Sequence, residues 1–168
     1  MSRISRLEKL LFRLEAQHAC LDRAFREIDG RPGVVSELGL GHGRTFDHLR
    51  RHLPDREIYV FDREVDSYPD CTPHPSRLIL GDLSITLPRA AQQFAGQVVL
   101  AHSDVGSFEA EHNQMMSALV SRHLPQALAP NAIILSDLPL AIGGAIALPL
   151  PQGAREDRYY FYRFGVAG

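Results

Sequence analysis

Apolar positions recur at steps of three and four along the first thirty residues of the chain. The series runs through Leu7, Leu10, Leu11, Leu14, His18, Leu21, Ala24, Phe25 and Ile28. This spacing places the side chains on one face of an α-helix. The segment 29–33, Asp-Gly-Arg-Pro-Gly, is rich in residues that end helices. The pattern therefore predicts one helix over residues 1–30 that covers an edge or a face of the core.

Short apolar runs alternate with helical patterns through the rest of the chain. The predicted strands are 34–38, 57–62, 77–80, 97–102 and 131–137, and the predicted helices are 45–53, 88–94 and 109–129. Residues 65–76 contain three prolines and no periodicity, so they are predicted to form a loop. Residues 145–150 and the aromatic run 158–164 predict a terminal hairpin. The segment 138–144 is short and glycine-rich, so no helix is predicted between the last of these strands and the hairpin.

The alternation of strands with helices is typical of an α/β fold with a parallel sheet. We expect a single domain over residues 1–168, with the repeated strand–helix units at 33–137 and the hairpin at 145–168. The length of 168 residues and the 45% hydrophobic content are sufficient for one ordinary core.

Charge and cysteine content exclude several classes of function. The formal net charge of −2 leaves no basic excess, which argues against a nucleic-acid partner. Cys20 and Cys71 have no Cys-x-x-Cys spacing, so neither a disulfide framework nor a zinc site is indicated. The N-terminus lacks the apolar core of a signal peptide, and no apolar run reaches membrane-spanning length. We therefore expect a cytoplasmic protein without a membrane partner.

The most informative segment is Val-Val-Ser-Glu-Leu-Gly-Leu-Gly-His-Gly at positions 34–43. It predicts a buried strand, a tight glycine turn and the start of a helix. Glycine permits the positive φ of a sharp turn and lets a ligand lie against the backbone. The first turn of a helix also offers unpaired N–H groups to anions. The segment therefore predicts a ligand site at the end of the first strand.

The acid and glycines of this segment resemble motif I of the class I S-adenosylmethionine-dependent methyltransferases. The order here is Glu37-x-Gly39-x-Gly41-x-Gly43, whereas dinucleotide-binding folds have Gly-x-Gly-x-x-Gly. The resemblance implies S-adenosyl-L-methionine as cofactor, bound by Glu37 and by the turn residues Gly39, Leu40, Gly41, His42 and Gly43. It also implies a three-layer sandwich around a Rossmann-like, seven-stranded, mostly parallel sheet, with an antiparallel C-terminal hairpin and a covering N-terminal helix.

Acidic residues follow the next two strands. Asp62 ends the second strand about twenty residues after the glycines, where a carboxylate can accept both ribose hydroxyls of an adenosine; the alternative is a solvated loop acid. Arg63 follows it and flanks the same site. The resemblance further implies that Asp82 binds the adenine amine and that the backbone N–H of Leu83 faces the ring. Asp82 is equally suited to cap the next helix, and both roles are compatible.

The fourth strand ends in His102, Ser103 and Asp104. Strand ends in an open α/β sheet face the ligand crevice, so Ser103 is a candidate cofactor contact and His102 or Asp104 a candidate general base. The alternatives are a satisfied buried histidine and a helix N-cap. Asp104 and Asp137 occupy places where some O-methyltransferases hold magnesium, but Leu138 stands where those enzymes usually have another ligand. We therefore predict no metal.

The resemblance also implies that an arginine near the end of the first helix, Arg23 or Arg26, meets the methionine carboxylate. The chain lacks the Asn/Asp-Pro-Pro-Tyr signature and any basic stripe, so a small-molecule acceptor is expected. The aromatic run at 159–164 suggests a homo-oligomer, unless its rings alternate between two covered faces. Two other functions remain open: a non-catalytic module that binds the cofactor, and an NAD-dependent oxidoreductase, which Asp62 would serve equally.

Overall fold

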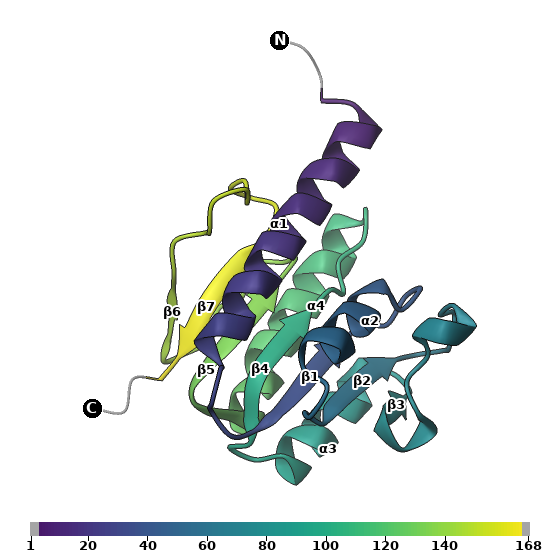
Figure 1. The fold of residues 1–168 in the computed structure, drawn as a ribbon, viewed down its shortest axis with the longest axis vertical. Helices are drawn as coiled ribbons and strands as arrows, with labels where there is room; N and C mark the ends of the chain where they lie inside the picture. The colour runs from purple at the N-terminus through teal and green to yellow at the C-terminus, as the bar shows by residue number, and fades with distance from the viewer. Residues whose placement is uncertain (1–3, 166–168) are drawn as a thin grey trace.

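A seven-stranded sheet forms the centre of the computed structural model, which describes residues 4–165 (Figure 1). The strands are β1 (Val34–Leu38), β2 (Ile58–Asp62), β3 (Leu78–Leu80), β4 (Val98–Ser103), β5 (Leu128–Ser136), β6 (Ala145–Ala147) and β7 (Tyr160–Phe164). Their order is β3-β2-β1-β4-β5-β7-β6. The first five strands are parallel, and β7 runs antiparallel to both β5 and β6. The predicted mixed sheet with its antiparallel C-terminal hairpin is confirmed.

Helices cover both faces of the sheet. They are α1 (Arg6–Glu27), α2 (Arg44–His52), α3 (Leu83–Gln93) and α4 (Ala110–His123), with short 3-10 turns η1 (Pro69–Cys71), η2 (Pro75–Arg77) and η3 (Leu124–Ala127). One core cluster joins α1 and α2 to Val35 of β1, and a second joins α3 and α4 to Leu38 of the same strand. Successive side chains of a strand point to opposite faces, so the two clusters fill the two interlayer spaces of a three-layer sandwich. None of the helices in the described range 4–165 is long and apolar enough to cross a membrane.

Helix α1 begins at a capping box. The backbone N–H of Glu8 donates to the Ser5 hydroxyl, and the N–H of Ser5 donates to the Glu8 carboxylate. The second half of α1 packs on the sheet through small residues, Ala16, Cys20 and Ala24. The leucines of the first half, Leu7, Leu10, Leu11 and Leu14, are exposed, because this half extends past the strands (Figure 1). The predicted apolar face is therefore buried only from Ala16 onward, and residues 1–3 of the predicted helix lie outside the described range.

Helices α3 and α4 differ from their predicted bounds, each for its own reason. Helix α3 begins at Leu83 and not at Pro88, because the Asp82 carboxylate accepts a hydrogen bond from the N–H of Ser84 and caps the helix there. Pro88 lies inside the helix. Helix α4 ends at His123, since Pro125 forces the chain out of the α-helix. Strand β5 consequently starts at Leu128, three residues earlier than expected.

Strand β7 lies one strand in from the sheet edge, with β6 outside it. The side chains of Tyr159 and Phe161 are buried in the α1 side of the core, and the Tyr162 hydroxyl accepts a hydrogen bond from the N–H of Leu140. These aromatic side chains therefore pack within the fold, which is the alternative that the sequence left open to an exposed oligomer interface. No helix lies between β5 and β6 in the described chain, as the sequence suggested.

Candidate functional site

The glycine turn after β1 holds the acid at the end of β2. The Asp62 carboxylate accepts hydrogen bonds from the backbone N–H groups of Leu40 (2.8 Å) and Gly41 (3.2 Å), and from its neighbour Arg63 (2.6 Å). Positive φ at Gly39, Gly41 and Gly43 makes this turn possible. The loop therefore fixes the carboxylate by backbone contacts alone.

The three glycines have different reasons to lack a side chain. A Cβ at Gly39 would lie 2.4 Å from the Asp104 carbonyl oxygen, and one at Gly43 would lie 2.3 Å from the Cys71 carbonyl oxygen. These two positions are required for packing. A Cβ at Gly41 would meet nothing within 4 Å, so this residue presents bare backbone to the open side of the turn.

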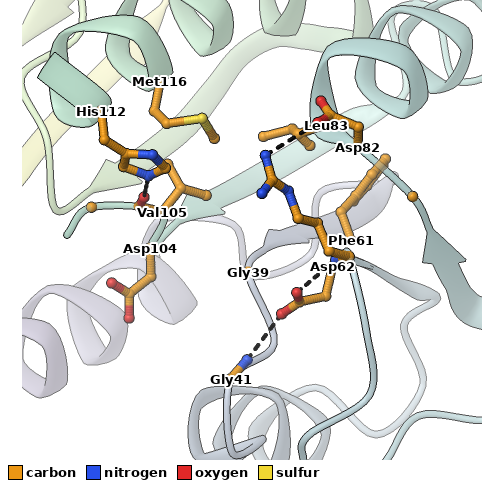
Figure 2. A pocket seen from close by; sticks show the side chains of 13 residues that line it. Gly39, Gly41, Phe61, Asp62, Asp82, Leu83, Asp104, Val105, His112 and Met116 are labelled. Carbon is orange, nitrogen blue, oxygen red and sulfur yellow. Dashed lines mark hydrogen bonds and ion pairs between the residues drawn. The ribbon is translucent and has the colours of Figure 1, made fainter.

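A cavity of about 320 Å³ opens on that side, and we call it the first lobe (Figure 2). Its walls include Gly41, Asp62, Arg63, Asp82, Leu83 and, from the other side, His112 and Met116 of α4. Arg63 pairs with Asp82 at 3.1 Å. Hydrogen bonds from Ser84 lower the pKa of the Asp82 carboxyl, so this residue caps α3 and lines the cavity at once. Both roles considered from the sequence are therefore geometrically compatible.

A second cavity of about 280 Å³ lies between α1 and the glycine turn, and we call it the second lobe. Arg13 and Gln17 line it from α1, and Leu40, His42, Arg44 and Thr45 line it from the turn and α2. Both lobes are bordered by Gly39, Gly41, Asp104 and Gly106. The two cavities are thus neighbouring parts of one site.

An ion pair between α1 and the end of β4 closes the second lobe. Arg13 pairs with Asp104, and Gln17 donates to the other oxygen of the same carboxylate at 3.3 Å. Burial disfavours the charge on Arg13, but Asp104 and the other nearby acidic groups outweigh it and raise the arginine pKa. The expectation for Arg23 or Arg26 is corrected: Arg23 donates to the Pro149 carbonyl and stacks on Phe161, and Arg26 borders a different cavity.

Asp137 stands behind the second lobe. Its carboxylate accepts hydrogen bonds from the N–H groups of Gly106 (2.8 Å) and Val105 (3.3 Å), and one oxygen lies 3.9 Å from Arg13. Burial, followed by the negative charge of Asp104, raises the pKa of Asp137 to about 6. Asp137 therefore orders the loop after β4, and a guanidinium already occupies the space next to both acids.

A buried chain of hydrogen bonds runs under the second lobe. Glu37 Oε1 lies 2.7 Å from His102 Nδ1, His102 Nε2 lies 2.6 Å from the Tyr159 hydroxyl, and Gln17 donates to that hydroxyl at 2.9 Å. Burial raises the pKa of the Glu37 carboxyl. Burial alone would lower the pKa of His102, but the neighbouring Glu37 carboxylate outweighs it, so the histidine pKa is raised above its usual value. The acid and the imidazole therefore hold a proton between them.

Burial changes the interpretation of three predicted site residues. His102 is 0% exposed and borders neither lobe, so the geometry does not support its use as the catalytic base; it is the satisfied buried histidine considered as the alternative. Glu37 is 1% exposed, also borders neither lobe, and contacts His102 through Oε1. Ser103 is also buried, borders neither lobe, and its hydroxyl has no hydrogen-bond partner among residues 4–165. Asp104 does face both lobes.

Sequence reasoning missed the α4 wall of the first lobe. His112 and Met116 are four residues apart in α4, so they lie on the same face of the helix. This spacing, in the first helix after β4, is the sequence signal that could have identified them. His112 Nε2 donates to the Val105 carbonyl at 3.1 Å, because a carbonyl can only accept. In a neutral ring the lone pair is then on Nδ1. His112 is thus a histidine of the site whose Nδ1 can act as an acceptor.

Comparison with known proteins gives one family and one fold. A family model described as S-adenosyl-L-methionine methyltransferase matches residues 4–164. The crystal structure of an S-adenosyl-L-methionine methyl transferase from Silicibacter pomeroyi DSS-3 is 42% identical, with a TM-score of 0.92 over 97% of this chain and 100% of that one. A search of the curated proteins finds no match.

More distant structures share the fold alone. MycE from the mycinamycin biosynthetic pathway, in complex with Mg and SAH, has a TM-score of 0.56 at 14% identity over 98% of this chain and 49% of its own. The antibiotic-resistance methyltransferase Kmr has a TM-score of 0.51 at 14% identity, over 84% of this chain and 91% of its own.

Proposed function

The chain belongs to the S-adenosyl-L-methionine methyltransferase family, whose model spans residues 4–164, and we propose that it methylates a small-molecule acceptor in the first lobe. The observation that carries the proposal is the division of one site into two lobes that meet at Gly41 and Asp104. A cofactor with an uncharged nucleoside and a zwitterionic amino acid requires two such environments.

The first lobe suits the nucleoside. Asp62 keeps acceptor capacity beyond its three backbone hydrogen bonds, which is the chemistry that ribose hydroxyls need. Asp82 can accept from the adenine amine, beside the apolar side chains of Leu83 and Phe61. The open side of Gly41 leaves room for a ligand against the backbone.

The second lobe suits the amino acid. Its lining carries a cation and an anion side by side, Arg13 and Asp104. A carboxylate would bind the guanidinium and an ammonium group would bind the carboxylate. When bound, the cofactor supplies an electrophilic methyl group on a sulfonium, so alignment of the acceptor matters more than strong acid–base chemistry.

The acceptor side of the first lobe is formed by His112 and Met116. Met116 offers an apolar, adaptable wall. His112 Nδ1 can take a proton from an acceptor hydroxyl or amine, the role first considered for His102. A small molecule is favoured because the chain has a net charge of −2 and no basic stripe for phosphates. Two free cysteines, Cys20 and Cys71, are consistent with the expected cytoplasmic location.

Transfer of a labelled methyl group tests the proposal. The labelled cofactor is incubated with small-molecule extracts and, separately, with tRNA, rRNA and DNA. We expect label in the small-molecule fraction, lowered about 10²–10⁴-fold by His112→Ala if proton removal is needed, and unchanged by His123→Ala at the far end of α4. Transfer to nucleic acid that Asp62→Ala abolishes would contradict the acceptor class. Cofactor binding without transfer to any fraction would favour the non-catalytic module.

A further inference from the structure

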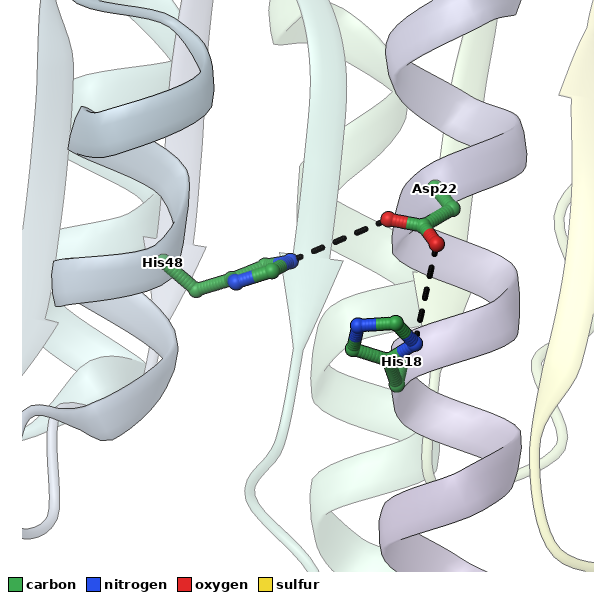
Figure 3. Close-up of side chains that lie close together, drawn as sticks. All are labelled: His18, Asp22 and His48. Carbon is green, nitrogen blue, oxygen red and sulfur yellow. Dashed lines mark ion pairs between the residues drawn. The ribbon is translucent and has the colours of Figure 1, made fainter.

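A second group of ligand-type side chains lies between α1 and α2, away from both lobes (Figure 3). His18 and Asp22 come from α1, and His48 comes from α2. His18 Nδ1 lies 3.6 Å from Asp22 Oδ2, and His48 Nε2 lies 3.9 Å from Asp22 Oδ1. The three potential ligand atoms all lie within 4.8 Å of one another.

These distances are too long for hydrogen bonds but close to those around a metal ion. Zinc–ligand bonds of about 2.0–2.2 Å in a tetrahedron place ligand atoms roughly 3.3–3.5 Å apart. Residues four apart on a helix share a face, so the fold itself brings the His18 and Asp22 side chains together. Small side-chain rotations would close the remaining gap.

His48 supplies an independent observation. Its Nε2 atom is buried and has no hydrogen-bond partner within residues 4–165. A buried polar atom without a partner is costly, and each native case needs an explanation. Figure 3 shows this nitrogen directed at the Asp22 carboxylate.

The types of ligand atom in this group indicate which metal ion would bind. Two imidazoles and one carboxylate suit zinc and similar divalent transition metals, whereas magnesium and calcium prefer oxygen ligands. Three protein ligands leave a fourth position for water. We propose that His18, Asp22 and His48 form a Zn²⁺ site that ties α1 to α2. The site goes beyond the proposed methyltransferase function and does not depend on it.

The position of the site gives it a structural consequence. Helix α1 carries Arg13 and Gln17 of the second lobe, and α2 starts directly after the glycine turn. A metal ion held by both helices would fix the wall of the second lobe relative to the turn. The sequence signal is the His18-x-x-x-Asp22 spacing on a helix together with a histidine on the next helix, a pattern that contains no cysteine.

Calorimetric titration of the untagged, metal-stripped full chain tests the proposal. Zn²⁺ is expected to bind with 1:1 stoichiometry, and Mg²⁺ at the same concentration is not. His18→Gln, Asp22→Asn and His48→Gln should each weaken Zn²⁺ binding more than about 100-fold, because even loss of an outer-shell partner costs roughly 10–100-fold. His74→Gln, at an exposed histidine immediately before η2, should leave the affinity unchanged.

Two further measurements keep the result interpretable. The His18 side chain is 65% exposed, so His18→Gln will not disturb the fold, and circular dichroism checks this for all three variants. Cys71→Ser removes the half-exposed thiol that could bind zinc elsewhere, and binding should persist in it. No stoichiometric binding, or binding that all three ligand variants retain, would overturn the site.

Discussion

The two lobes of the site are built in different ways. In the first, Asp62 is held by backbone N–H groups of a turn only 21 and 22 residues away in sequence. In the second, Arg13 reaches Asp104 across 91 residues, and Gln17 reaches it across 87. The first lobe therefore depends on strands that are adjacent in the sheet. The second exists only while α1 is docked, so changes to α1 should affect one lobe and spare the other.

The largest effect is expected at Gly41, which borders both lobes. In Gly41→Val a branched side chain would enter the open space in front of the turn and force an unfavourable backbone at φ +51°. We expect S-adenosylhomocysteine affinity to fall at least about 100-fold, roughly 2.7 kcal/mol. Calorimetry measures this.

Gly96→Val is the matched control, because Gly96 also has positive φ and open space but lies outside both lobes. It should lose stability by about 1–3 kcal/mol and retain its affinity. Equal loss of affinity in both variants would show that strain, and not the site, is responsible.

Asp137 and Asp82 should change the stability of the protein with pH in opposite directions. The pKa of Asp137 is raised to about 6 from 3.8, so the folded state holds its proton more tightly than the unfolded state does. Its contribution to stability is therefore present at low pH and is lost as pH rises from about 4 to about 6, by up to about 3 kcal/mol. Asp82, whose pKa is lowered mainly by Ser84, stabilises above its unfolded pKa and loses this contribution in acid.

Urea denaturation of the wild type and of Asp137→Asn between pH 4 and pH 7 isolates the first of these effects. The wild type should lose free energy of unfolding relative to the variant as pH rises, and the difference should level off above about pH 7. A second series from about pH 4 down to about pH 2 covers Asp82, because its pKa is lowered from 3.8; there the wild type should lose free energy of unfolding relative to Asp82→Asn as the pH falls. Parallel curves for the wild type and Asp137→Asn would refute the assignment.

Asp62→Ala tests the ribose contact proposed for the first lobe. Removal of an acceptor for ribose should cost roughly 1.5–3 kcal/mol of binding free energy, the range for hydrogen bonds to charged groups. Both adenosine and S-adenosylhomocysteine should bind more weakly by the same factor, since both contain the ribose. Calorimetric titration with each ligand gives the comparison, and Asp55→Ala, an exposed acid before β2, is the control. Unchanged affinity would exclude Asp62 from the site.

The side of the first lobe formed by the glycine turn and Asp62 could be predicted from sequence because its parts are local. The spacing of Glu37, the glycines and Asp62 follows from a strand, a turn, a helix and the next strand, and each boundary carries its own signal. Asp82 and Leu83, which the family resemblance pointed to, line the same cavity. The strand pattern does not show whether a side chain near a strand end is buried or lines the cavity. Glu37 and His102 lie near the ends of neighbouring strands, yet both side chains are buried in the core under α1.

The second lobe could not be predicted because it depends on how α1 packs. Periodicity identified the helix but gave no information on where along the sheet it lies, and the exposed Leu7 and Leu14 fitted the apolar face as well as the buried residues did. The docking position selects Arg13 over Arg23, a difference of almost three helical turns. The wall formed by His112 likewise depends on the orientation of α4.

Arg13→Met gives the smallest effect and separates the two lobes most directly. Methionine keeps much of the apolar stem of Arg13 but removes the guanidinium from Asp104. The arginine side chain is 43% exposed, so solvent screening limits the loss to about 1 kcal/mol, or roughly fivefold in S-adenosylhomocysteine affinity. Adenosine, which has no amino acid to place in the second lobe, should bind as it does to the wild type. Arg6→Met, an exposed arginine in the first turn of α1, should change neither affinity. If Arg13→Met weakened adenosine binding as much as S-adenosylhomocysteine binding, the two lobes would be one cooperative pocket, and the division between them would be wrong.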